Sequence, residues 1–147
     1  MDSLSSATVV SFTSEATAEA VTVEIGYVPA KVVAYVYNGA NVDIYTWWDQ
    51  AKFEDIADAD GSEDDAIKLT GSTGITTIVD DAISKHTGGT EITTSVDENF
   101  RNRFGEIPTA YAAGDARNLK SSAGITLAAA IQVNSGVVVL EAYRLAE

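Results

Sequence analysis

Residues 31–48 read KVVAYVYNGANVDIYTWW, and this stretch decides the fold class. Residues 31–37 are a run of β-branched and aromatic residues, which favours an extended strand. Asn38-Gly39 follows, and both residues tolerate the positive φ angles of a hairpin turn. Residues 42–48 repeat the strand composition, so the stretch predicts a β-hairpin.

Other segments on both sides of this hairpin also have strand character. They lie at residues 20–25, 67–70, 91–96, 124–133 and 137–144. In the last of them, consecutive apolar residues predict a strand that is buried on both faces. Residues 75–83 fit either a strand or a short helix, and residues 85–90 are predicted to be a turn. Strands dominate and turns recur, which predicts an all-β fold, an antiparallel β-sandwich or barrel of jelly-roll-like type, as one domain over residues 15–147.

Two segments are predicted to lie outside the regular strands. Residues 1–14 are rich in Ser, Thr and Ala and lack a clear period, which indicates a flexible N-terminal arm. The apolar residues of this arm are candidates for contact with a partner: Leu4, Val9, Val10 and Phe12. Residues 97–104 are predicted to form a helical turn. They begin a long excursion, residues 97–123, of a kind that is uncommon in compact domains unless it has a role.

The charge of the chain limits its partners. Nine basic residues stand against 22 acidic ones, and the net charge is −13. Such a chain is repelled by nucleic acid and by anionic membranes. There is no cysteine, which excludes disulfides and thiolate chemistry. The first residues lack the basic and apolar regions of a secretory signal, and no stretch is apolar enough to span a bilayer, so we expect synthesis in a cytoplasm.

An acidic segment at residues 54–65 is the best candidate for a metal site. Its carboxylates could supply the oxygen ligands that calcium needs. The candidates are Asp58, Asp60, Glu63, Asp64 and Asp65. Their spacing does not match the EF-hand loop. A solvated acidic loop that faces a basic partner is the alternative.

Catalytic motifs are nearly absent from the sequence. The single histidine, His86, has Ser84 and Asp80 nearby. Catalytic triads usually come from distant segments, so this proximity does not indicate one. The Gly-containing turn at residues 71–74 lacks the lysine of a phosphate-binding loop. We therefore expect no enzyme activity and no cofactor.

Aromatic and basic residues supply further candidates for an interface. Trp47 and Trp48 are adjacent, and in a strand they point to opposite faces, so one can enter the core while the other faces outward. A basic face that contacts the acidic loop of a neighbouring copy could be formed by Arg101, Arg103, Arg117 and Lys120. Such a head-to-tail contact closes a ring of three or more subunits.

Two blocks of the chain resemble a recurring pattern in small accessory proteins of tailed-bacteriophage virions. The first block carries a Gly-aromatic-x-Pro-x-x-Val step, a hairpin and a Trp-bearing strand. Its matching positions are Gly26, Tyr27, Pro29, Val32, Asn38 and Trp47. The second block matches at Gly124-Ile125, Ser135-Gly136 and residues 141–144. The family's basic residue after Pro29 is replaced by Ala30, and residues 84–123 have no counterpart.

The resemblance implies a virion accessory protein: a capsid decoration (cement) protein, or a head-fibre or tail component. The leading hypothesis is a structural capsid decoration protein that binds the major capsid protein. The resemblance implies no catalytic residues. The expected assembly is a homotrimer over a three-fold junction of the shell. Three alternatives stay open at this point: a tail or fibre component, a non-viral calcium- or carbohydrate-binding module, and, as the least favoured, a glycosidase with paired carboxylates.

Overall fold

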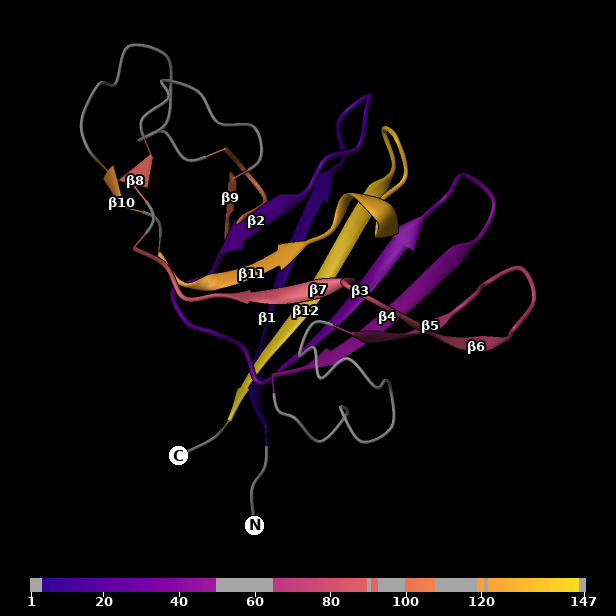
Figure 1. Ribbon diagram of the computed structural model, residues 1–147, viewed down its shortest axis with the longest axis horizontal. Coiled ribbons are helices and arrows are strands. Elements are labelled where there is room, and N and C mark those ends of the chain that lie inside the picture. Colours follow the sequence, from indigo (N-terminus) through magenta and orange to yellow (C-terminus); the bar gives the residue numbers. More distant parts are fainter. Residues whose placement is uncertain are drawn as a thin grey trace.

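The computed structural model of the chain describes residues 4–49, 65–89, 91–92, 100–107, 119–120 and 122–145. Within these residues the protein is an all-β sandwich of two main sheets, as the sequence predicts (Figure 1). Neither sheet closes into a barrel in the described part of the chain, since the first and last strands of each sheet are not paired with one another.

The larger sheet has six antiparallel strands. Their order across the sheet is β1 (Leu4–Thr13), β12 (Val137–Leu145), β3 (Lys31–Tyr37), β4 (Val42–Trp48), β5 (Ala66–Leu69) and β6 (Thr76–Val79). The C-terminal strand β12 thus lies between the N-terminal strand and the hairpin. This arrangement places segments from both ends of the sequence side by side in one sheet, with β1 at its edge.

The second sheet has four strands and lies across the first (Figure 1). Its order is β7 (Ile83–His86), β11 (Gly124–Leu127), β2 (Val21–Glu24) and β9 (Phe100–Asn102). The β2–β9 pair is parallel, and the other pairs are antiparallel. A two-stranded ladder joins β8 (Glu91–Ile92) to β10 (Leu119–Lys120), and a 3-10 turn, η3 (Ala129–Ile131), precedes β12.

The predicted hairpin is confirmed with the same strand limits. Its register places Lys31 opposite Trp48, and the two strands stay paired as far as Tyr37. The connection is a four-residue loop. The Asn38 side-chain oxygen accepts a hydrogen bond from the Asn41 N–H at 2.8 Å, and Gly39 has φ 92°. The positive φ explains why glycine suits this position.

The core lies between the two sheets. From the six-stranded sheet it takes Val10, Phe12, Val32, Ala34, Val36, Tyr45, Trp47, Ala66, Val138, Leu140 and Ala142. From the second sheet it takes Val21, Val23, Ile83, Ile125 and Leu127. Removal of this apolar surface from water is the main force that holds the sheets together.

The predicted N-terminal arm is wrong for residues 4–13. These residues form β1, which pairs with β12 over most of its length. Val10 and Phe12 are buried in the core at 1% and 5% exposure. The adjacent apolar pair Val9-Val10 obscured the two-residue period in the sequence.

Two further local predictions are corrected by strands of the second sheet. Residues 100–102, assigned to a helical turn, form β9 and pair with β2. His86, assigned to a turn, lies in β7. Both segments are short and lack alternation, and their extended form depends on partners that are distant in sequence. In the ambiguous segment 75–83, a strand forms over Thr76–Val79.

Candidate interaction surface

The six-stranded sheet has one face that the second sheet does not cover, and we call it the outer face. Side chains alternate between the two faces of a strand, and paired residues share a face. One row across the outer face runs Val9, Glu141, Val33, Thr46, Ile67 and Ile78. The next row runs Ser11, Val139, Tyr35, Ile44, Leu69 and Thr76. Glu141 is the single charged residue in these two rows.

Apolar side chains of the outer face are exposed at one end of the sheet and towards its two edges. Val9 is 59% exposed, Tyr37 51%, Ile78 42%, Val137 40% and Leu69 39%. The side chains between them are partly exposed. The prediction that residues 137–144 are buried on both faces therefore fails for the single chain, because Val137 and Val139 lie on this uncovered face. Large contiguous apolar patches of this kind mark interaction surfaces in soluble proteins.

Lys31 is the basic residue of the outer face, and its charge is held between aromatic rings. The register sets Lys31 between Tyr143 and Trp48. Its ammonium nitrogen lies 5.4 Å from the Trp48 ring centroid and 5.7 Å from that of Tyr143. Both distances are within the range of cation–π attraction.

Glu141 is held by tyrosine hydroxyls on the same face. The Tyr143 hydroxyl donates to Glu141 Oε2 at 3.0 Å. The hydrogen bond to Glu141 also raises the pKa of Tyr35 above its usual value, with smaller contributions from burial and from the negative charge of Glu141. The hydrogen bond from the Tyr143 hydroxyl to Glu141 raises the pKa of Tyr143, and desolvation and the negative charge of Glu141 add to this effect. A phenol that donates to a carboxylate holds its proton more tightly.

A shallow hollow of about 340 Å³ lies at one end of the outer face. Tyr37, Gly39, Ser135, Gly136 and Val137 line it. A side chain at Gly136 would meet the Tyr37 carbonyl, so glycine allows the β3 hairpin and the turn before β12 to approach closely. The lining offers apolar surface and one phenol, and no charged side chain.

The interface candidates from the sequence are divided between the core and the surface. Val9 and Trp48 lie on the outer face. Val10, Phe12 and Trp47 are core residues, so their assignment to an interface is wrong. The tryptophan pair points to opposite faces, as predicted. Leu4 lies in β1 opposite Leu145, and its side chain is outside the description.

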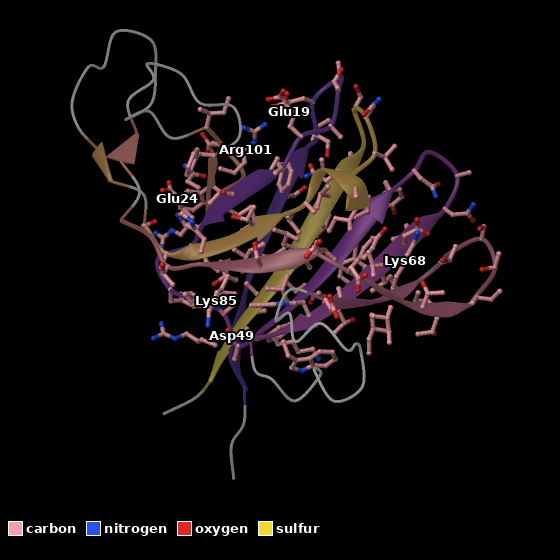
Figure 2. The ribbon with its side chains drawn as sticks, in the orientation of Figure 1. Glu19, Glu24, Asp49, Lys68, Lys85 and Arg101 are labelled. Atoms are coloured by element: carbon pink, nitrogen blue, oxygen red, sulfur yellow. The ribbon has the colours of Figure 1, made fainter. Side chains whose placement is uncertain are left out.

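The predicted basic face is not supported at Arg101. Arg101 is 8% exposed and lies over the Phe12 ring at 5.7 Å, so it belongs to the packing between the sheets. Figure 2 shows it beside β2, at the side of the second sheet. Arg103 is exposed and lies over the Phe104 ring. Arg117 lies outside the described residues.

The proposed acidic metal ligands lie almost entirely outside the described residues. Asp58, Asp60, Glu63 and Asp64 are not described, and Asp65, directly before β5, is buried at 8% exposure. In the described ranges no cluster of three or more His, Asp or Glu residues could hold a metal ion. Asp49, the residue after β4, pairs with Lys85 of β7 at 3.5 Å (Figure 2).

His86, the single histidine, packs against an aromatic ring. It is oriented edge-on to Phe100, with a centroid distance of 6.3 Å. This contact joins opposite edge strands of the second sheet, β7 and β9. The geometry is that of two rings packed edge to face.

In the part of the chain that is described, no helix has the length and apolar character needed to cross a membrane. No protein-family model matches the chain, and comparisons with curated proteins and with solved structures find no match either.

Sequence patterns alone did not predict the outer face. The available signal was apolar residues at both odd and even positions of residues 31–37 and 137–144.

Proposed function

We propose that this protein has a structural role and acts by assembly, not by catalysis. More specifically, we propose that it is a capsid decoration (cement) protein of a tailed phage, located on the virion and bound to the major capsid protein. The exposed apolar outer face is the observation that supports a role in assembly, since such a face is suited to a protein partner. The resemblance of the two sequence blocks supplies the phage context.

The physical properties of the chain suit such a role. A sandwich of two sheets is a stiff body, and the broad outer face can hold it against another protein. The net charge of −13 keeps free copies soluble and away from packaged DNA. The resemblance implies a homotrimer over three-fold junctions of the shell. This arrangement and the face-to-face dimer proposed in the next subsection exclude each other, and the oligomeric state in solution decides between them.

A tail or fibre component is the closest alternative, because the same face could attach to a tail protein. A carbohydrate-binding module is the second candidate, and the rings of Trp48 and Tyr143 on the outer face favour it. Sugar sites need hydrogen-bonding groups beside such rings. The two central rows are mainly aliphatic, which favours a protein partner instead.

The copy number of the protein in purified virions tests the proposal. Quantitative mass spectrometry should give a fixed, simple ratio to the major capsid protein, as expected for a protein that covers the shell. A few copies per particle would favour the tail or fibre alternative. Absence from particles would refute the virion role, and glycan-array binding would then test the carbohydrate alternative.

A further inference from the structure

We propose that the outer face of the six-stranded sheet is covered by the outer face of a second copy of the same chain. The inference uses the same surface as the proposed function but does not depend on the phage context. If two copies pair through the outer face, binding to a shell must use another surface. The available area is the first argument. Six strands about 4.8 Å apart and about 20 Å long give a projected area of about 600 Å². The relief of the side chains raises the accessible area towards the ~800 Å² that each partner contributes to a stable interface.

The second argument is the local charge. The whole chain is strongly acidic, yet the described outer-face side chains that carry charge are Lys31 and Glu141, and their charges cancel. A face that recognises a basic partner would be expected to show an acidic excess, because interfaces are electrostatically complementary. A neutral, apolar face is instead complementary to itself.

The third argument is that both charges already have partners within the chain. The Lys31 ammonium lies over the Trp48 and Tyr143 rings, and Glu141 accepts a hydrogen bond from the Tyr143 hydroxyl. Covering a charged group costs most when it loses water without gaining a partner. These contacts allow an apolar surface to cover the face at a lower desolvation cost.

The geometry of such a contact follows from the packing of sheets. Two sheets pack face to face at about 10 Å, with their strands roughly aligned. Contact between identical faces is isologous and closes at two copies. Strand β12 would then be covered on both faces, as its consecutive apolar residues predict.

Val33→Lys is the variant that tests the inference. Val33 lies in the middle of the sheet and opposite Glu141, so a lysine there meets a carboxylate across the strand pair. The single chain should therefore fold, whereas the dimer must bury the added charge. Ala130→Lys is the matched control, because it adds the same charge at an exposed position of η3 outside the outer face.

The experiment measures the mass of the full chain by light scattering and sedimentation over a wide concentration range. The unmodified chain and Ala130→Lys should be dimers, and Val33→Lys should dissociate about tenfold or more readily. Circular dichroism melts should show that each variant is folded. Added salt should strengthen the dimer, since it screens repulsion between two acidic chains.

A chain that stays monomeric at every concentration would overturn the inference. A trimer, or a dimer that Val33→Lys does not affect, would overturn the face-to-face arrangement. If the monomer instead binds purified shells through Val33, the capsid is the partner of this face and the proposed function stands without the dimer. If the protein forms this dimer but is absent from virions, the dimer stands and the virion role fails.

Discussion

Trp47 and Trp48 provide a direct test of which face of β4 enters the core. Trp47 is 1% exposed and lies opposite Val32 on the inner face. Truncation of a buried tryptophan to alanine costs about 3–5 kcal/mol, because contacts are lost and a cavity remains. Trp48 is partly exposed, and its truncation should mainly remove the contact with Lys31, which contributes about 0.5–1 kcal/mol. Trp47→Ala should therefore reduce the free energy of unfolding by at least about 2 kcal/mol more than Trp48→Ala.

Urea unfolding followed by far-ultraviolet circular dichroism measures this difference without relying on tryptophan fluorescence. The variants should be compared at low protein concentration in the Val33→Lys background, so that self-association does not contribute. Trp47→Phe is a useful control, because it keeps much of the buried volume and should cost less than Trp47→Ala. Equal losses for the two alanine variants, or a larger loss for Trp48→Ala, would show that the face assignment is wrong.

Two further predictions concern strand pairing and alkaline stability. Gly124→Ala should lower the free energy of unfolding by about 1–3 kcal/mol or more, and the urea midpoint with it, because its Cβ would lie 1.8 Å from a carbonyl oxygen of β2. Unchanged stability would contradict this register. The pKa values of Tyr35 and Tyr143 are raised above 10.0 in the folded state, so the stability from their hydrogen bonds to Glu141 is fully present below about pH 10 and is lost as the pH rises through the folded values. Tyrosinate absorbance should appear at higher pH in the folded chain than in urea, and Tyr35→Phe should remove part of this delayed titration. Identical titration curves in the two states would refute the assignment.

Local sequence patterns were sufficient for some elements but not for others. The β3–β4 hairpin combines two uniform strand segments with an Asn-Gly turn, so its identity and limits follow from neighbouring residues alone. Strand β9 could not be found in this way, because three residues become a strand only when β2 supplies their hydrogen-bond partners. The same applies to β1, whose alternation is visible only after Val10 and Phe12 are known to face the core.

The candidate site depended even more on tertiary contacts. The opposite orientation of Trp47 and Trp48 follows from the two-residue period of any strand. Which of them is buried depends on which side of the sheet the β7-β11-β2-β9 sheet covers. The assignment of Arg101 to a surface failed for a similar reason, since its position over Phe12 requires β9 and β1 to meet across the sandwich.

The sequence by itself determined the all-β class, the central hairpin, the acidic charge and the lack of thiol chemistry. These properties depend on composition or on the alternation of adjacent residues, which is a local feature of the chain. Tertiary structure alone decided the order of the strands and the inclusion of the N-terminal segment in the sheet. It also decided the alignment of Lys31, Tyr35, Glu141 and Tyr143 on the face that the second sheet does not cover. The physical reason is that strand pairing is made by hydrogen bonds between distant segments, and only the register of those bonds turns separate apolar residues into a continuous surface.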